Sequence, residues 1–224
     1  MLFGKIEYLN LLPFHLFMKR YSRSTRHYMS FRYKKGVPSK INAEYAARRV
    51  DAAFISSIKA QKESYVDLGI IAKKEVLSVL LLPSNNFVED NASASSNVLA
   101  NILGLKGEVI IGDKALRHYL SSDDNAQDLA KLWYEKYKLP FVFALLCYHQ
   151  HDQEIKRLAT TFKKCHSKIP QYELINASRR TGISPDAIQH YLTYISYELD
   201  HKAKAGLQKF WHLSKRQNPK TSLK

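Results

Sequence analysis

The sequence predicts an α/β fold with two lobes and a ligand cleft between them, and three observations support this. The N-terminal third alternates short apolar runs with amphipathic runs, which is typical of a mainly parallel sheet flanked by helices. Several expected strands end in hydroxyl, amide or acidic residues where a helix is expected to begin. Two long apolar strands, at 76–82 and 139–148, bracket a segment of roughly 60 residues, which suits a small second lobe.

The pattern of the first 49 residues predicts a strand followed by a helix, twice in succession. Asn10 lies in the turn after the first strand, Pro13 is well placed to open the next helix, and Ser39 marks the start of the second helix. The expected elements are, in order, a strand over 3–9, a helix over 14–21, a strand over 31–33 and a helix over 39–49.

The stretch at 50–58 is the candidate centre of the fold. Its apolar run is too short for a helix, ends in Ser56 and Ser57, and is followed by an amphipathic segment that predicts a helix over 58–65. Unpaired N–H groups and the positive end of a helix dipole meet at such a junction, so it suits a carboxylate or phosphate. For this pair taken alone, a serine that only caps a helix is the favoured explanation, so the assignment depends on other residues.

The middle of the chain repeats this junction. Ser95 and Ser96 mark the start of a helix over 97–105, while Gly112 and Asp113 open a helix after an apolar strand. Junctions of this kind gather around one crevice in an open α/β sheet. The remaining expected elements are strands over 70–72, 76–82, 109–111 and 139–148, helices over 114–120, 126–137, 152–166, 172–180, 186–199 and 201–213, and a frayed basic tail from Ser214.

These elements predict a division into two lobes. Residues 1–82 and 149–224 form lobe I with the C-terminal helices, and residues 83–148 form lobe II, including the crossing strand that returns to lobe I.

Composition limits the classes of binding partner and the cellular compartment to be expected. Lys and Arg outnumber Asp and Glu by 35 to 20, a net charge of +15, which would attract nucleic acid, anionic lipid or a small anionic substrate. The basic residues are spread along the whole chain, so the charge alone does not choose among these. No apolar run approaches the roughly 20 residues that span a bilayer. Two cysteines and no recognisable secretory signal favour the cytoplasm.

Seven segments in the same order resemble the MqnA family of menaquinone biosynthesis, the chorismate dehydratases of the futalosine route, and together they cover most of the chain. The segments are IEYLNLLPF at 6–14, DAAFISSI at 51–58, LSVLLLPS at 77–84, SASSNVLANILGL at 93–105, IIGDKAL at 110–116, DLAKLWYEKYKLPFVFALLCY at 128–148 and YLTYISYELDHKAKAGLQKFW at 191–211.

The resemblance implies a type II periplasmic-binding-protein-like fold used as an enzyme. It implies a lyase that removes water from chorismate to give 3-[(1-carboxyvinyl)oxy]benzoate, without a metal or organic cofactor. No nucleic acid and no membrane is expected as a partner, and the oligomeric state is left open.

Motif positions assign the site residues. Asn10 matches the asparagine of the YLN motif and is expected to orient the reacting ring or to stabilise charge in the transition state. The residues expected to bind substrate are Ser56, Ser57, Ser78, Ser95, Ser96, Gly112 and Asp113. None of these motifs holds a strong general base, so we expect a carboxylate of the substrate itself to remove the proton.

Four alternatives compete with this interpretation. The sister MqnD family shares the fold and acts on cyclic dehypoxanthine futalosine. A non-catalytic binding protein would hold chorismate without turning it over. Residues 177–194 resemble a DNA-binding helix-turn-helix, although Tyr191 and Tyr194 favour packing into a core. Cys147, His149 and His151, with Cys165 and His166, would supply zinc ligands, but their spacing fits no common zinc pattern.

Overall fold

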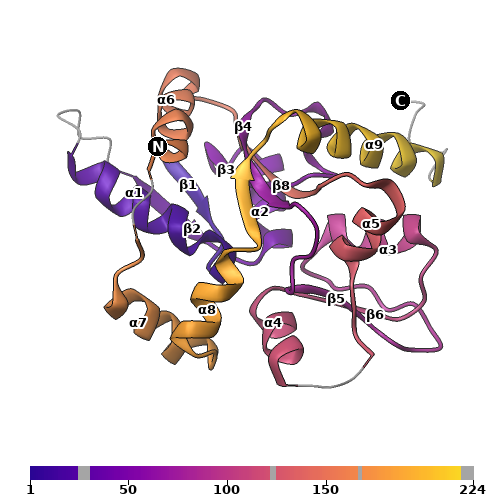
Figure 1. Cartoon of the computed structure of the whole chain (residues 1–224). Coiled ribbons are helices and arrows are strands. Elements are labelled where there is room, and N and C mark those ends of the chain that lie inside the picture. The colour runs from indigo at the N-terminus through magenta and orange to yellow at the C-terminus, as the bar shows by residue number, and fades with distance from the viewer. Residues whose placement is uncertain (25–30, 122–124, 166–167, 218–224) are drawn as a thin grey trace.

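The computed structural model describes residues 1–24, 31–121, 125–165 and 168–217 (Figure 1). Its strands are β1 Leu2–Lys5, β2 Arg32–Lys35, β3 Ala52–Ser56, β4 Tyr65–Ala72, β5 Val79–Leu82, β6 Glu108–Ile111, β7 Gln127–Asp128, β8 Phe141–Tyr148 and β9 Ile195–Glu198. Its helices are α1 Leu12–Ser24, α2 Pro38–Ala46, α3 Ala94–Leu103, α4 Gly112–Ser121, α5 Leu129–Tyr137, α6 Asp152–Lys163, α7 Gln171–Thr181, α8 Pro185–Leu192 and α9 His201–Gln217, with the 3-10 turns η1 Leu9–Leu11 and η2 Ala60–Lys62.

The larger sheet has six strands in the order β2-β1-β3-β8-β4-β9. β1 pairs parallel with β2 and β3, whereas β8 pairs antiparallel with β3 and β4, and β9 pairs antiparallel with β4. The expectation of a mainly parallel sheet is therefore wrong. Sequence rhythm detects the parallel N-terminal strands, but β8 inserts between β3 and β4 from a distant part of the chain.

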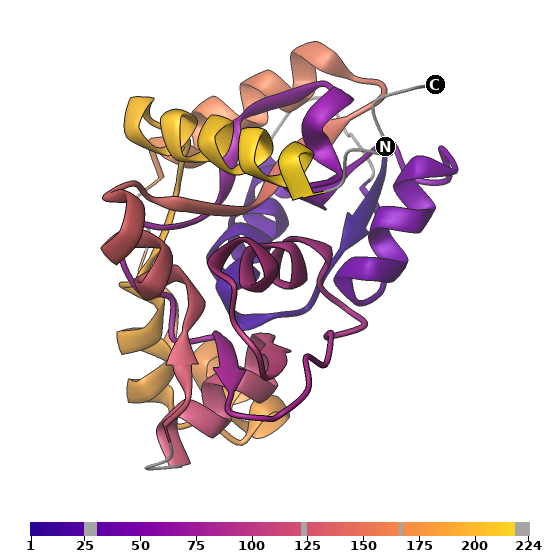
Figure 2. The ribbon, with the colours of Figure 1, turned by 90° about the vertical axis from the view of Figure 1, so that its right-hand side faces the viewer.

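The smaller sheet has three antiparallel strands in the order β6-β5-β7. Helices α3, α4 and α5 lie beside it, and α9 and α8 lie at opposite ends of the molecule in both views (Figures 1 and 2). Strand pairing places β5 in the small sheet and β8 in the large one. The division into lobes at residues 82/83 and 148/149 stays a prediction.

Aromatic side chains fix helices onto the large sheet. Phe14 of α1 makes edge contacts with Phe54 of β3 and Phe162 of α6, with ring centroids 4.9 and 5.2 Å apart. Phe141 of β8 contacts Phe210 of α9 at 4.8 Å. Each of these buried rings contributes about 1.5–3 kcal/mol by leaving water. The result is a rigid frame for the loops between the strands and helices.

Two expected helices are wrong. After Ser57 the chain makes a turn and the short η2, and β4 then begins at Tyr65, so no helix covers 58–65. In β4 the exposed Asp67 stands between buried Val66 and Leu68, which is the alternation of a strand. The second half of the helix expected over 186–199 is β9, which extends the sheet beside β4.

Several helix boundaries also differ from the expectation. Helix α2 begins at Pro38 without a side-chain cap, and α3 begins at Ala94 with Ser93 as its cap. Helix α9 continues to Gln217, so the chain is still helical at Ser214, where a frayed tail was expected. Among the described residues, no helix is long and apolar enough to cross a membrane.

Candidate active site

A cavity of about 70 Å³ lies where the two sheets face each other. Five of the eight predicted site residues line it: Asn10, Ser56, Ser78, Ser96 and Gly112. The remaining lining residues are Ile6, Tyr8, Leu11, Pro38, Phe54, Ile70, Val76, Val79, Ser93, Ile111, Phe143 and Ala144. Residues from both sheets thus contribute polar groups and apolar walls to one cavity.

Asn10 lies in η1, which follows β1 of the large sheet after a short loop. Its backbone carbonyl accepts a hydrogen bond from the Tyr197 hydroxyl at 2.7 Å, which ties this turn to β9. Its side-chain oxygen Oδ1 is buried and has no hydrogen-bond partner in the protein. A buried acceptor without a partner costs stability, and because Asn10 lines the cavity, this residue is a candidate for a ligand contact.

Ser56 is the last residue of β3, and Asn42 of α2 holds it with two hydrogen bonds. The Nδ2 group of Asn42 donates to Ser56 Oγ at 2.8 Å, and the Ser56 backbone N–H donates to Asn42 Oδ1 at 3.1 Å. Asn42 was not among the predicted residues, because nothing in the sequence links a helical asparagine to a strand end 14 positions later.

Ser57 and Ser95 are buried but do not line the cavity. Their hydroxyls lie 3.1 Å apart, and the Ile58 backbone N–H donates to Ser95 Oγ at 3.2 Å. The Trp211 indole N–H donates to the Ser57 carbonyl at 2.8 Å. These bonds join the end of β3 to the start of α3 and to α9, and a direct contact of either serine with substrate stays a prediction.

The start of α3 supplies two more hydroxyls to the cavity. Ser93 caps the helix by accepting from the Ser96 backbone N–H at 3.2 Å, and its hydroxyl donates to Ser96 Oγ at 2.7 Å. Ser93 was missed, although a serine three residues before another polar helix residue is a recognisable capping pattern. Because Pro38 and Gly112 also line the cavity, the N-termini of α2, α3 and α4 all border it. Their dipoles favour negative charge there.

Ser78 connects the cavity to the C-terminal part of the chain. Its hydroxyl lies 2.8 Å from that of Tyr191 on α8, and its backbone carbonyl accepts from the Gly112 N–H at 2.8 Å. Burial raises the pKa of Tyr191, so its phenol is neutral at neutral pH. Residues 177–194, the segment that resembles a helix-turn-helix, lie in the end of α7, in α8 and just beyond it. Tyr191 of α8 is buried, as the packing interpretation expected.

Gly112 lies where no larger residue fits. Its φ is +68°, and a Cβ placed on it would come within 2.7 Å of the Tyr8 ring. Burial, with Asp90 and Asp113 nearby, raises the pKa of Tyr8 to about 12. Tyr8 therefore stays a neutral phenol and forms one wall of the cavity over the start of α4.

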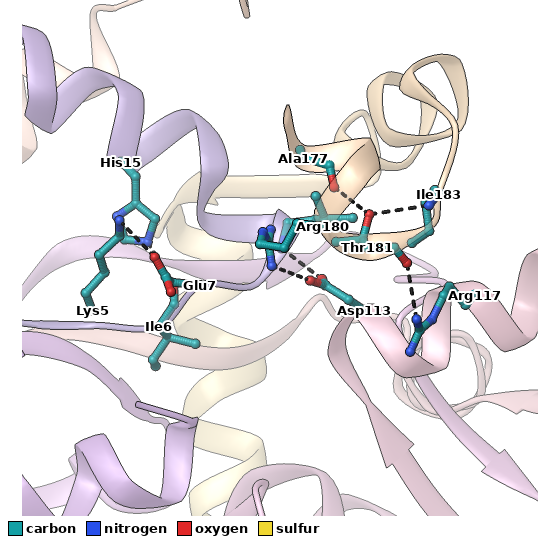
Figure 3. A network of polar contacts seen from close by, with 11 residues as sticks. Lys5, Ile6, Glu7, His15, Asp113, Arg117, Ala177, Arg180, Thr181 and Ile183 are labelled. Atoms are coloured by element: carbon teal, nitrogen blue, oxygen red, sulfur yellow. Dashed lines mark hydrogen bonds and ion pairs between the residues drawn. The ribbon is translucent and has the colours of Figure 1, made fainter. Parts of the chain in front are cut away.

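Asp113 lies beside the cavity and links α4 to two other elements (Figure 3). Its Oδ1 accepts from the Leu9 backbone N–H at 2.9 Å, and its Oδ2 pairs with Arg180 of α7 at 3.1 Å. Burial raises the pKa of this carboxyl, and the bonds from Leu9 and Arg180 oppose that shift. Both oxygens are engaged within the protein, and a contact of Asp113 with substrate stays a prediction.

The cavity has no charged side chain among the described residues that line it, and Tyr8 is its one titratable group. Its polar atoms are hydroxyls, one amide and backbone groups at helix starts. Such a lining can bind an anion through neutral donors, which are strong in an environment of low dielectric constant.

Two larger cavities lie elsewhere in the molecule. One of about 300 Å³ lies between α1, α6 and β9, and one of about 460 Å³ lies between β1, α1 and α7. Neither is lined by any of the eight predicted site residues. We therefore take the smaller cavity between the sheets as the candidate active site.

The zinc alternative finds no support in the described part of the chain, where no cluster of three or more His, Cys, Asp or Glu could hold a metal ion. His149 stacks on Tyr45 with ring centroids 3.9 Å apart and bonds to its carbonyl at 2.9 Å. The Cys147 thiol is fully buried, and burial raises its pKa. His166, part of that alternative, lies outside the described residues.

Comparison with known proteins agrees with the resemblance seen in the motifs. A family model described as menaquinone biosynthesis matches residues 1–104 and 85–216. A chorismate dehydratase of Campylobacter jejuni is 42% identical over 213 residues, which cover 94% of this chain and 96% of that protein. A chorismate dehydratase of Thermus thermophilus is 24% identical and covers 92% of each chain.

Solved structures confirm the predicted fold class. Protein AF1704 of Archaeoglobus fulgidus superposes with a TM-score of 0.66 at 11% identity, covering 97% of each chain. The alkanesulfonate-binding protein SsuA of Xanthomonas axonopodis gives 0.59 at 11% identity and covers 97% of this chain and 93% of its own. The Candida albicans CA3427 product, described as having the generic periplasmic binding protein fold, gives 0.56 at 11% identity, covering 96% and 89%. Together, the family match over most of the sequence and the C. jejuni relative show that the chain belongs to the menaquinone-biosynthesis family.

Proposed function

We propose that the chain is a chorismate dehydratase, a lyase that eliminates water from chorismate to give 3-[(1-carboxyvinyl)oxy]benzoate. The observation that carries this proposal is the buried cavity between the two sheets, where Asn10 presents an unpartnered amide oxygen among hydroxyls and helix N-termini. The chorismate dehydratase of C. jejuni, at 42% identity, gives the reaction its name.

Chorismate is a dianion, and the cavity offers complementary groups for two carboxylates. Ser56 lies at the end of β3 on the large sheet, whereas Ser96 lies at the start of α3 beside the small sheet. Ligand pockets typically have volumes of about 300–1,000 Å³, so in this proposal the cavity of about 70 Å³ widens to admit chorismate. Closure around the substrate then excludes water from the reaction.

The elimination breaks the C3–H bond and the C4–O bond of the ring. The C3 proton and the C4 hydroxyl leave as water, and the ring becomes aromatic, which supplies the driving force. Hydrogen bonds to the ring carboxylate stabilise the negative charge that is delocalised onto it as the proton leaves. Since the described lining has no carboxylate or imidazole, a carboxylate of the substrate removes the proton in this proposal.

Asn10 orients the reacting part of the ring. Its Oδ1 atom accepts hydrogen bonds, so its partner on the substrate must be a donor. The C4 hydroxyl is the one O–H group of the chorismate dianion. Asn10 therefore positions the leaving hydroxyl, while its amide N–H groups can donate to developing charge.

The proposal also covers compartment and cofactors. It includes no metal and no organic cofactor, and it places the enzyme in the cytoplasm, where a small anionic metabolite is its partner.

The test is to incubate the purified protein with chorismate, without added metal or cofactor, and to identify products by chromatography and mass. We expect the enolpyruvyl-benzoate at a mass 18 lower than that of chorismate, the loss of one water. Tight binding without turnover would instead identify a binding protein. If chorismate is neither bound nor converted, cyclic dehypoxanthine futalosine is the next substrate to offer, and salt-dependent binding to duplex DNA would support the helix-turn-helix alternative.

A further inference from the structure

The orientation of the Asn42 amide is fixed by what it faces. The Ser56 backbone N–H can only donate a hydrogen bond, so the atom 3.1 Å from it must be the amide oxygen Oδ1. The other branch of the amide is then Nδ2, which lies 2.8 Å from Ser56 Oγ. No assumption about the ligand enters this assignment.

This orientation determines the role of the Ser56 hydroxyl. An amide NH₂ group has two donors and no acceptor, so Ser56 Oγ accepts the hydrogen bond from Asn42. The single hydroxyl hydrogen of Ser56 is then left to donate elsewhere. Ser56 is only 6% exposed and lines the cavity, so that hydrogen is available to a ligand there.

The other hydroxyls of the cavity are not constrained in this way. Ser78 lies 2.8 Å from the Tyr191 hydroxyl, and either of the two can donate. Ser96 accepts from the Ser93 hydroxyl, but this partner is itself a rotatable group. Ser56 is the hydroxyl whose direction is set by a rigid amide and a backbone N–H.

The support for Asn42 is rigid as well. Its neighbour Ile41 and the later helix residue Tyr45 are 0% and 1% exposed, and they anchor α2 against the large sheet. Asn42 reaches Ser56 from the first half of this short helix, whose N-terminus borders the cavity at Pro38. The amide therefore cannot easily swing away from Ser56.

We propose that Asn42 is a positioning residue that makes Ser56 an obligate donor, and that the substrate group bound there is an ionised carboxylate. This inference rests on the proposed dehydratase function and extends it to the group that recognises one end of the substrate. An ionised carboxylate has acceptors only and carries a negative charge, so it forms a stronger hydrogen bond with this donor than the neutral hydroxyl or ether oxygens of chorismate do.

The change that tests this is Asn42→Asp. Both side-chain oxygens of the aspartate accept, so the Ser56 hydroxyl turns to donate to it, and a negative charge then faces the substrate. We expect KM for chorismate to rise at least about tenfold, because a charge-assisted hydrogen bond is lost, with a smaller change in kcat. Asn85→Asp is the matched control, since it adds the same charge at an exposed position and should leave KM unchanged.

The decisive measurement is a double-mutant cycle with Ser56→Ala. If Asn42 acts through Ser56, Asn42→Asp adds less to KM in the Ser56→Ala background than in the wild type, and the part that remains is repulsion by the added charge. The inference would be overturned if the effects of the two single substitutions on KM simply multiplied in the double variant. A Ser56→Ala variant with normal KM would overturn it too. Asn42→Ala is a second route if the aspartate variant fails to fold, and we expect it to raise KM less, because the freed hydroxyl can still turn to the substrate.

The wild-type assay separates this inference from the proposed function. If the wild type converts chorismate but the effects of Asn42→Asp and Ser56→Ala on KM multiply in full, only the role of Asn42 is refuted. A wild-type protein that neither binds nor converts chorismate refutes the dehydratase function and, with it, the carboxylate assignment.

Discussion

At the scale of single residues, the candidate site contains a buried polar atom that has no partner within the protein. Asn10 Oδ1 is buried without a hydrogen bond, whereas most buried acceptors in proteins are satisfied. Motif position in the sequence identified Asn10, Ser56, Ser78, Ser96 and Gly112 as site residues, and all five line one cavity. It missed Asn42 and Ser93, because their roles arise from hydrogen bonds that motif matching does not contain.

We predict that Asn10→Ala abolishes most turnover without unfolding the protein. Losing one preorganised polar contact to the reacting group lowers kcat by about 10²-fold or more. The alanine removes no hydrogen bond that Oδ1 makes in the free protein, so the thermal midpoint should change little. Steady-state kinetics and circular dichroism measure the two quantities, and a variant with full activity would refute the role of Asn10.

Gly112→Ala should damage both stability and activity. A Cβ would lie 2.7 Å from the Tyr8 ring, and the φ of +68° is unfavourable for alanine. We expect a loss of about 1 kcal/mol or more in the free energy of unfolding, together with a raised KM as Tyr8 is displaced. Denaturant unfolding is the check, and Gly104→Ala is a control, because it has a similar φ of +72° with no atom within 4 Å.

The buried His15 imidazole should make the free energy of unfolding depend on pH. Its Nε2 bonds to the Ile6 carbonyl at 2.8 Å, Nδ1 is buried without a partner, and burial lowers its pKa from 6.5 to about 4. A histidine with a lowered pKa in the folded state binds fewer protons than in the unfolded chain. Its contribution to stability is therefore complete above pH 6.5 and is lost as the pH falls toward 4.

Between pH 7.5 and pH 5 this group should remove about 2 kcal/mol of unfolding free energy. His15→Gln keeps a donor for the Ile6 carbonyl but takes up no proton, so its stability should fall less over the same range. Urea unfolding at the two pH values gives the comparison. Equal losses in the wild type and the variant would show that His15 is not responsible.

At the scale of elements, the sequence located the helix starts that carry the site better than the strand order. Helices α3 and α4 begin within one or two residues of the expected junctions, since serine and glycine signals there are local. The helix expected after Ser57 and the second half of the one expected over 186–199 are wrong. Residues of β4 and β9 are strands because they pair with partners far away in the chain, which periodicity in a short segment does not reveal.

The cap of α3 gives a prediction at this scale. Ser93→Ala removes the acceptor for the Ser96 N–H and the donor to Ser96 Oγ, so we expect a loss of about 1 kcal/mol of stability. The same change leaves the Ser96 hydroxyl free to rotate, so KM for chorismate should rise. Ser93→Thr preserves both contacts and should restore stability and KM. Failure of threonine to restore them would argue against the capping role.

At the scale of the whole molecule, the fold class was predictable because motifs along the chain keep their order. The expected mainly parallel sheet was not correct, because the insertion of β8 between β3 and β4 depends on long-range topology. The shape and small volume of the cavity were equally invisible to the sequence. They depend on residues of both sheets that are far apart in the sequence, and on contacts such as that between Ser78 and Tyr191 of α8.

The net charge of +15 gives a prediction at this scale. An excess of positive charge raises the encounter rate with a dianionic substrate, and salt screens this attraction over about 10 Å at 0.1 M. We expect kcat/KM for chorismate to fall as sodium chloride rises from low to moderate concentration, with kcat nearly constant. A kcat/KM that does not depend on salt would show that the charge serves another purpose.

The measurement that tests the central claim most directly is turnover of chorismate by the wild type and by Asn10→Ala, side by side, with products identified by mass. The account predicts the enolpyruvyl-benzoate from the wild type and a rate lower by about 10²-fold or more from the variant. Equal rates would contradict the role assigned to Asn10 in the reaction. No product from a folded wild-type protein would contradict the dehydratase function itself.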